Sequence, residues 1–184
     1  MKKKGYKIIV CCNTLNVIGD KGNLIYHIKK DMENFKKVTM GNVVIMGRKT
    51  FESLPNKKPL KGRVNIVLTQ DKDYYIDIDE NNDDDTDLYI CHTIEDVDDL
   101  LKTYYYDLEW FVIGGSRIYS EYLDRRLVSK IYMTLVYDDK DGDTRFPIIN
   151  RYEWKRYELS METDEEKQLT FSFNTFVSKD KDFK

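Results

Sequence analysis

The 184-residue chain has few of the side chains on which metal centres and disulfide frameworks depend, with three cysteines and two histidines. The cysteines are odd in number, lack the spacing of a metal finger and lie in strand-like apolar runs. We therefore expect buried free thiols in a reducing compartment. Cys91-His92 is an adjacent pair of ligand types, but such a pair alone does not predict a metal site, and we expect none.

Long apolar runs, internal repeats and linkers are also missing from the sequence. The basic N-terminus, residues 1–5, is not followed by an apolar stretch that could act as a signal peptide or cross a membrane. With 41% hydrophobic and 34% charged residues, the composition is typical of one folded domain with a substantial core. We expect a single cytoplasmic domain over residues 1–184 that does not associate with membranes.

Positive charge is scarce in one part of the chain and abundant in the rest. Between Asp71 and Asp99 there are thirteen acidic residues and one lysine, although the whole chain has a net charge of only −3. This balance argues against a general nucleic-acid binder, and the basic remainder suits an anionic ligand held away from the acidic part. A solvated surface insertion near residues 71–87 explains the acidic part equally well.

Two segments of the chain share one pattern, in which an apolar strand runs into glycine, an arginine follows and a helix begins. The first segment covers residues 43–50 and the second covers residues 110–118. Each presents open backbone N–H groups and a guanidinium at the positive end of a helix, where a phosphate binds well. Glycine after a strand can also serve packing alone, so one such turn is weak evidence for a phosphate site. Two of them favour a ligand with several phosphates, and a dinucleotide is the leading hypothesis.

The order of the elements predicts an α/β fold. Strand and helix patterns alternate, which favours a mostly parallel sheet flanked by helices, and two long alternating segments at the end predict an antiparallel hairpin at its edge. Thr93 is expected to cap a helix with acidic residues in its first turn. The expected strands are 8–12, 43–46, 64–68, 88–91, 110–113 and 130–136, the helical segments 27–37 and 50–54, the long loops 13–24 and 138–147, and the hairpin strands 152–161 and 168–178.

Asp31 is an acidic residue on the apolar side of the first expected helix. None of its neighbours three or four positions away is lysine or arginine, so the usual exposed ion pair along a helix is absent. Burial at the edge of a pocket would raise its pKa towards a range useful for acid–base chemistry. The alternative is an aspartate on a solvated flank beside neighbouring lysines. The apolar stripe consists of Ile28, Met32 and Phe35, and the lysines are Lys29, Lys30 and Lys36.

Six stretches, in the right order and with matching spacing, resemble the dihydrofolate reductase family along nearly the whole chain. They cover residues 17–19, 31–36, 44–54, 62–69, 112–119 and 142–147. The resemblance implies a mixed, mostly parallel sheet of eight strands and reduction of dihydrofolate to tetrahydrofolate with NADPH. The protein would hold the two rings face to face for hydride transfer to carbon 6 of the pterin, with water protonating nitrogen 5 and residues 13–24 acting as a lid.

The resemblance also assigns the substrate-binding residues. Asp31 would bind the amino group and ring nitrogen of the pterin, and Thr134 would be the hydroxyl partner of that carboxylate. Arg63 would pair with the carboxylate of the glutamate tail. Apolar residues would line the pocket for the pterin and its aryl spacer, although plain core packing explains several of them equally well. They are Ile9, Val10, Met32, Phe35, Leu54, Leu60, Ile113 and Tyr119.

The two glycine turns would form the NADPH site. Arg48 and Lys49 would contact the 2′-phosphate and the pyrophosphate, with Thr50 on the same turn. Gly114-Gly115 resembles the unusual cis peptide of the family. The remaining cofactor residues would be Cys11, Ile18, Gly47, Thr69, Gln70, Ile113, Ser116, Arg117, Ile118 and Tyr119.

The chain departs from the family pattern at three places. Ile25-Tyr26 stands where the family has Pro-Trp, so Tyr26 takes a position counted among the catalytic residues with a different reach. Ile28-Lys29 replaces Leu-Pro, and Gln70 stands where an arginine or serine often contacts the 2′-phosphate. Two alternatives therefore stay open: a pteridine or pyrimidine reductase that has no need of Arg63, and a weak or non-enzymatic nucleotide-binding module. We expect a monomer.

Overall fold

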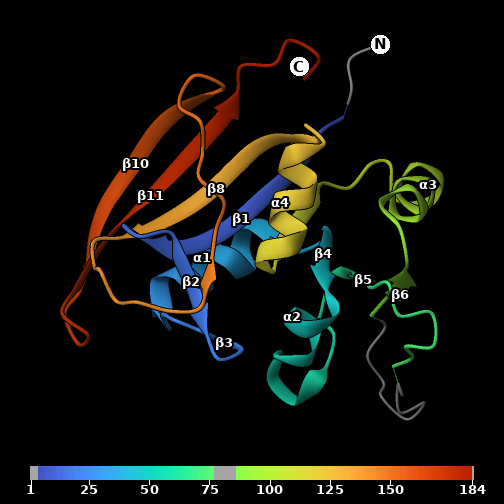
Figure 1. The fold of residues 1–184 in the computed structure, drawn as a ribbon, viewed down its shortest axis with the longest axis horizontal. Coiled ribbons are helices and arrows are strands. Elements are labelled where there is room, and N and C mark those ends of the chain that lie inside the picture. Colours follow the sequence, from blue (N-terminus) through green and yellow to red (C-terminus); the bar gives the residue numbers. More distant parts are fainter. Residues whose placement is uncertain (1–3, 77–85, 184) are drawn as a thin grey trace.

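The computed structural model describes residues 4–76 and 86–183, and Figure 1 shows their arrangement. Its strands are β1 (Tyr6–Asn13), β2 (Val17–Asp20), β3 (Asn23–Leu24), β4 (Val43–Gly47), β5 (Val64–Leu68), β6 (Leu88–Cys91), β7 (Trp110–Gly114), β8 (Val128–Val136), β9 (Thr144–Arg145), β10 (Trp154–Asp164) and β11 (Leu169–Ser178). Its helices are α1 (Lys29–Thr39), α2 (Arg48–Glu52), α3 (Ile94–Tyr104) and α4 (Ser116–Asp124), with a short 3-10 turn, η1 (Pro55–Lys57).

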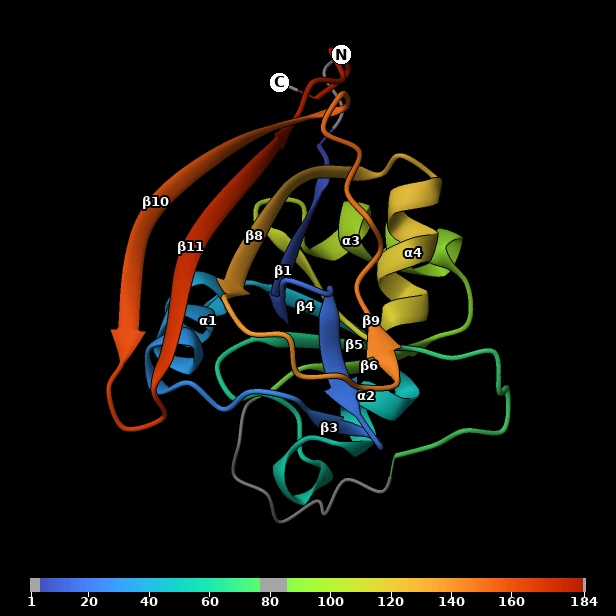
Figure 2. The same ribbon diagram turned by 60° about the vertical axis from the view of Figure 1, so that its left-hand side comes forward.

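The main sheet has eight strands in the order β10-β11-β8-β1-β7-β4-β5-β6. The six strands from β8 to β6 are paired in parallel, while β11 pairs antiparallel with both β8 and β10. The central strands are almost wholly apolar, with the buried Asn65 in β5 as a polar residue among them, as expected where helices cover both faces. The predicted α/β fold with an antiparallel C-terminal hairpin is confirmed, and Figure 2 shows the hairpin at one edge of the sheet.

Helices pack on both faces of the sheet and define two layers of core. On one face, α3 and α4 contribute Val97, Leu101 and Tyr122 to a large cluster with alternate residues of β1. On the other face, Phe51 of α2 and Phe35 of α1 pack against a second cluster. Because side chains alternate along a strand, odd-numbered residues of β1 face α1 and even-numbered ones face α4.

The predicted cap of α3 is confirmed in detail. The Thr93 hydroxyl accepts a hydrogen bond from the Asp96 N–H at 3.0 Å, and the Asp96 carboxylate accepts one from the Thr93 N–H at 2.9 Å. The two residues thus form a reciprocal capping box. The start of this helix is therefore set by local sequence.

The two long loops predicted at residues 13–24 and 138–147 each contain strand. A small sheet of order β3-β2-β9 joins them, with Val17 opposite Arg145 and Gly19 opposite Thr144, and both figures place β2 beside β9. The prediction of loop is therefore wrong at these strands, because turn residues gave no sign of a pairing whose partner lies far away in the sequence.

Several predicted boundaries shift by a few residues. The first helix begins at Lys29 rather than residue 27, because Ile28 has an extended backbone. The second helical segment, α2, is residues 48–52 rather than 50–54. The strand predicted at 130–136, β8, begins at Val128. The first hairpin strand, predicted at 152–161, is Trp154–Asp164.

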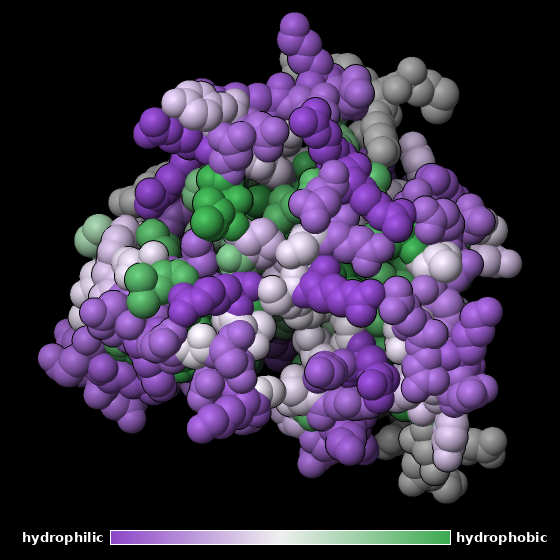
Figure 3. Space-filling view, viewed as in Figure 1, coloured by the Kyte–Doolittle hydropathy of each residue, from purple (hydrophilic) through white to green (hydrophobic). Residues whose placement is uncertain are grey.

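The surface in Figure 3 is covered mainly by hydrophilic residues, with smaller hydrophobic patches between them.

The acidic insertion predicted near residues 71–87 lies in large part outside the described residues. Across residues 4–76 and 86–183, no helix is long and apolar enough to cross a membrane. The three cysteines are free thiols, with Cys12 and Cys91 buried and Cys11 half-buried.

Candidate active site

The centre of the site is the carboxylate of Asp31, on the face of α1 that meets the sheet. Thr134 Oγ1 donates a hydrogen bond to Asp31 Oδ1 at 2.5 Å. Thr134 lies directly opposite Cys11 in the parallel pairing of β8 with β1. Two neighbouring strands therefore present a hydroxyl and a thiol side by side to the same half-buried carboxylate.

The environment of Asp31 shifts its protonation in the predicted direction. Burial raises the pKa of the Asp31 carboxyl, while the Thr134 hydroxyl and the Cys11 thiol oppose that rise by stabilising the charged form. Burial also raises the pKa values of Cys11 and Tyr119, so both keep their protons near neutral pH. Burial and the two hydrogen bonds thus act in opposite directions on the pKa of Asp31, and the neighbouring Cys11 and Tyr119 carry no charge near neutral pH.

The apolar residues predicted to line a substrate pocket divide between the two faces of the sheet. Phe35, Leu54, Leu60 and Ile113 pack around the cluster that contains Ile9, on the face that carries α1. Val10 instead packs into the cluster on the α4 face, so its side chain points away from Asp31. The prediction for the Val10 side chain is wrong because an adjacent strand residue necessarily faces the other side. Met32 is 47% exposed.

Arg63 lies beside this apolar group. Its Nη1 donates to Thr39 Oγ1 at 3.3 Å and its Nε to the Lys61 carbonyl at 3.1 Å. Its guanidinium carbon is 5.9 Å from the centre of the Phe35 ring, and partial burial lowers its pKa. The guanidinium is therefore oriented by neutral partners, and a small hollow of about 160 Å³ adjoins it.

The first glycine turn joins β4 to α2. Gly47 has an extended backbone and no side chain caps the helix that follows it. Arg48 Nη1 lies 3.4 Å from Glu52 Oε1, and its guanidinium carbon is 5.5 Å from the Tyr74 ring centre. Lys49 is exposed. The turn therefore presents two cations, one of them supported by an aromatic ring.

The second glycine turn joins β7 to α4 and lies beside the first. The peptide between Gly114 and Gly115 is cis, as the resemblance predicted, and Gly114 has a φ of +124°. A Cβ on Gly115 would lie 3.3 Å from Thr50 Oγ1, so the two turns approach each other closely. Ser116 begins α4, whose N-terminus has no side-chain cap.

The other predicted cofactor residues differ in their exposure. Thr69 and Gln70 follow β5 at the same end of the sheet, with Thr69 buried and Gln70 exposed. Arg117 is exposed on the first turn of α4, whereas Ile118 is buried. The Tyr119 hydroxyl donates to the Ile9 carbonyl at 2.9 Å. Carboxyl ends of adjacent parallel strands thus converge on one cradle, the usual place for a ligand in this fold class.

Tyr26 is buried, with 7% of its surface exposed, and its hydroxyl is already bonded within the protein. It donates to Asp138 Oδ2 at 2.8 Å and accepts from Asn13 Nδ2 at 3.2 Å. Sequence reasoning missed Asn13 and Asp138. A polar residue at the end of the apolar run 8–12 was a signal for Asn13, but nothing local pointed to Asp138.

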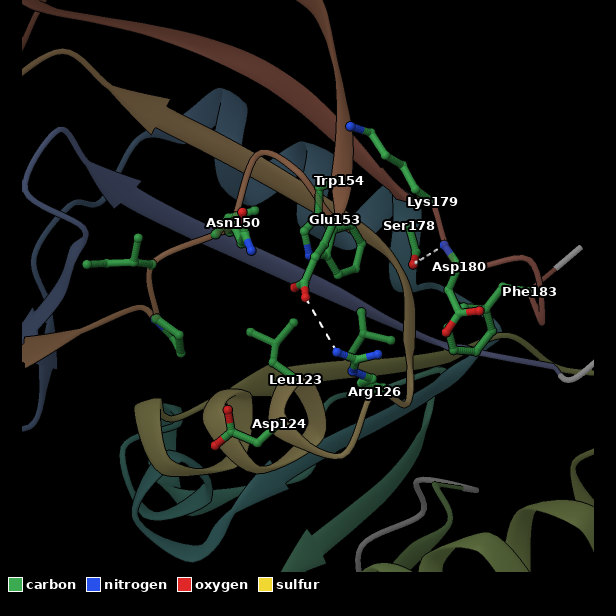
Figure 4. Close-up of a pocket in the computed structure, with 14 residues that line it drawn as sticks. Leu123, Asp124, Arg126, Asn150, Glu153, Trp154, Ser178, Lys179, Asp180 and Phe183 are labelled. Carbon is green, nitrogen blue, oxygen red and sulfur yellow. Dashed lines mark hydrogen bonds and ion pairs between the residues drawn. The ribbon is translucent and has the colours of Figure 1, made fainter.

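A hollow of about 440 Å³ lies in another part of the molecule, between α4 and the start of β10 (Figure 4). Arg126 and Glu153 form an ion pair of 3.6 Å across it. None of the predicted site residues lines this hollow. It is therefore separate from the site at Asp31.

Comparisons with known proteins agree with this geometry. A sequence model of dihydrofolate reductase matches residues 6–178. Dihydrofolate reductase of Bacillus subtilis is 34% identical over 154 residues, which cover 82% of this chain and 80% of the relative. The enzyme of Staphylococcus haemolyticus is 32% identical over 172 residues, which cover 92% and 93%.

A solved structure is also similar along the whole chain. Dihydrofolate reductase from Enterococcus faecalis, complexed with NADP(H) and RAB-propyl, superposes with a TM-score of 0.79 at 27% identity. The match covers 98% of this chain and 100% of the other. The sequence match, the shared fold and the paired glycine turns lead to one conclusion: the chain belongs to the dihydrofolate reductase family.

Proposed function

We propose that this chain reduces 7,8-dihydrofolate to 5,6,7,8-tetrahydrofolate with NADPH. The observation that carries the proposal is the half-buried Asp31 carboxylate, held by Thr134 at 2.5 Å on the sheet face that also carries the apolar cluster around Ile9. Such a group can accept two parallel hydrogen bonds from the amino group and ring nitrogen of a pterin. Membership of the family and the likeness to an enzyme complexed with NADP(H) support the same activity.

The two glycine turns fit NADPH. A Cβ on Gly115 would stand 3.3 Å from Thr50 Oγ1, so a side chain there would crowd the threonine of the first turn. No side chain caps α4, so its first backbone N–H groups are open to a phosphate. Arg48 and Lys49 supply positive charge for a 2′-phosphate. When bound, NADPH supplies the hydride that reduces carbon 6 of the pterin.

The residues of the chain itself orient the substrate and control its proton. Asp31 fixes the pterin by hydrogen bonds and, as an anion, favours the protonated form of the ring. Thr134 keeps the carboxylate in place. Cys11 and Tyr119 hold their protons too strongly to act as acids near neutral pH, so we assign the delivery of the proton at nitrogen 5 to water.

Arg63 distinguishes folate reduction from reduction of a smaller pteridine. Its Nη1 and Nε already bond to Thr39 and to the Lys61 carbonyl, which hold the guanidinium in one orientation. A bidentate pair with the carboxylate of a glutamate tail suits that geometry. Arg63→Ala should therefore raise KM for dihydrofolate and leave KM for a tail-free dihydropteridine unchanged.

The test of the function is the oxidation of NADPH by the purified protein in the presence of dihydrofolate. Asp31→Asn should lower the rate strongly near neutral pH. Glu33→Gln, on the same helix and exposed, is the matched control and should keep the wild-type rate. Tight binding of NADPH without any turnover would instead favour the non-enzymatic alternative, and full activity of Asp31→Asn would refute the role of Asp31.

Two further inferences concern the state of the protein in the cell. We infer a reducing compartment, the cytoplasm, because all three cysteines are free thiols. We also infer a monomer, which light scattering of the purified protein tests. A molar mass well above the 22.0 kDa of one chain would contradict that inference.

A further inference from the structure

The hydroxyl of Tyr26 lies at the centre of a partly buried polar cluster that joins two segments far apart in the sequence. It donates to Asp138 Oδ2 at 2.8 Å and accepts from Asn13 Nδ2 at 3.2 Å. Tyr26 is 7% exposed and Asn13 is fully buried. A buried cluster of this kind is stable only when its polar groups are paired.

Asn13 is satisfied at every position of its side-chain amide. Its Oδ1 accepts from the backbone N–H groups of Leu15 at 3.0 Å and Val17 at 2.9 Å. Its Nδ2 donates to the Lys140 carbonyl at 2.7 Å as well as to Tyr26. Because Asn13 holds the N–H of Val17, the start of β2 is fixed by the same cluster.

Asp138 supplies the second anchor, at the end of β8. One of its carboxylate oxygens accepts from Tyr26, and the other accepts from the Asp139 N–H at 2.8 Å. Its backbone carbonyl accepts from the hydroxyl of Thr14 at 2.7 Å. The segment that contains β2 is therefore fastened to the residues that follow β8.

We propose that Tyr26 is a positioning residue whose hydroxyl, through Asn13 and Asp138, holds the segment of residues 14–24 closed over the cofactor side of the site. The segment lies on this side because its strand β2 pairs with β9, and the Arg145 carbonyl of β9 accepts from Ser116 Oγ at the start of α4. Loss of the hydroxyl removes one donor from the half-buried Asp138 carboxylate and leaves one N–H of the buried Asn13 without its acceptor, which favours opening. The catalytic consequence rests on the proposed function, whereas the closure itself does not.

Limited proteolysis tests the closure without any assay of activity. Lys21 is exposed at the tip of the segment, so trypsin can cut after it whenever the segment opens. A hydrogen bond to a carboxylate is worth roughly a tenfold change in an equilibrium, so Tyr26→Phe should speed cleavage after Lys21 by about tenfold. The double variant Tyr26→Phe/Asp138→Ala should be cut little faster than Asp138→Ala alone.

Two variants keep this test specific. Tyr137→Phe removes a hydroxyl that bonds to Ser172 at 3.0 Å, outside the cluster, and should leave cleavage after Lys21 unchanged. Asp138→Asn keeps an oxygen that can accept from Tyr26, so it should open the segment less than Asp138→Ala. Cleavage of Tyr26→Phe at the wild-type rate, with its melting temperature intact, would overturn the proposal.

Kinetics with dihydrofolate separate positioning from general loss of structure. In Tyr26→Phe, KM for NADPH should rise by about tenfold, while kcat at saturating NADPH falls much less, because bound cofactor restores the closed segment. Partial unfolding would instead lower kcat and leave KM unchanged. If the chain does not reduce dihydrofolate, the proposed function fails, while trypsin cleavage still decides the role of Tyr26.

Discussion

Arg48 provides the sharpest test of how the site selects its cofactor. Its guanidinium lies 3.4 Å from Glu52 and 5.5 Å from the Tyr74 ring centre, so it is already oriented near the first glycine turn. Gln70, at the end of the neighbouring strand, is neutral. Arg48→Ala removes the cation assigned to the 2′-phosphate while Lys49 remains.

Two opposing contributions set the expected loss of NADPH binding in Arg48→Ala: the hydrogen bonds to the phosphate and the ion pair with Glu52. The ion pair with Glu52 is about 40% exposed on the arginine side, and exposed pairs of this kind contribute roughly 0–1 kcal/mol. Hydrogen bonds between a guanidinium and a phosphate contribute about 1.5–3 kcal/mol. The phosphate hydrogen bonds exceed the ion pair by about 0.5–3 kcal/mol, and a loss of about 1.4 kcal/mol within that range is roughly tenfold in kcat/KM for NADPH.

The assay compares initial rates with NADPH and with NADH, each at saturating dihydrofolate. Arg48→Ala should lower kcat/KM about tenfold with NADPH and leave it unchanged with NADH, which lacks the 2′-phosphate. Arg125→Ala, whose guanidinium pairs with Glu95 and Glu121 at the far end of α4, is the matched control. An equal fall with both cofactors would refute the reasoning, because it would place Arg48 at a group that the two share.

Three further substitutions test other parts of the structure. Asp31→Asn should stabilise the fold at pH 7, since burial raises the Asp31 pKa and ionisation therefore costs stability as pH rises. The gain in melting temperature should vanish towards about pH 4, near the ordinary pKa of an aspartate, and a gain that stays constant would contradict it. Thr93→Ala should lower the free energy of unfolding by about 1 kcal/mol in urea titration, through loss of the helix cap; no change would show that the cap contributes nothing. Gly114→Ala should destabilise by about 1–3 kcal/mol and weaken NADPH binding in a fluorescence titration, because φ is +124° and the new Cβ would stand 3.3 Å from the Tyr119 hydroxyl; unchanged binding would contradict the cradle.

Local sequence predicted most of the main sheet and the elements that carry the glycine turns. Residues 43–46 and, apart from Asn65, residues 64–68 are short apolar runs typical of buried strands, and Thr93 marked its helix by side-chain chemistry alone. The absence of a basic partner on the helix pointed to burial of Asp31, but the sequence left a solvated flank equally open, and the contact with Thr134 on a distant strand decides between them. The roles assigned to Arg63 and Arg48 came from family resemblance and stay predictions.

What the sequence hid was set by contacts between distant residues. The pairing of β2 with β9 joins residues near 17 to residues near 145, and turn-forming residues on both sides concealed it. The Val10 side chain was assigned to the wrong face because a resemblance gives positions without the alternation of the strand. The partners of Tyr26 lie 13 and 112 residues away, so neither pattern nor spacing indicated them.

Two of the three free cysteines, Cys12 and Cys91, can show by their reactivity which part of the fold opens. Burial raises the pKa of Cys12 to about 12 and that of Cys91 to about 11, so neither thiol reacts readily while the fold is closed. Cys12 lies in β1 at the middle of the sheet and Cys91 lies in β6 at its edge. The relative rates at which a thiol reagent labels these two positions would therefore tell whether the edge of the sheet opens by itself or only when the whole domain unfolds.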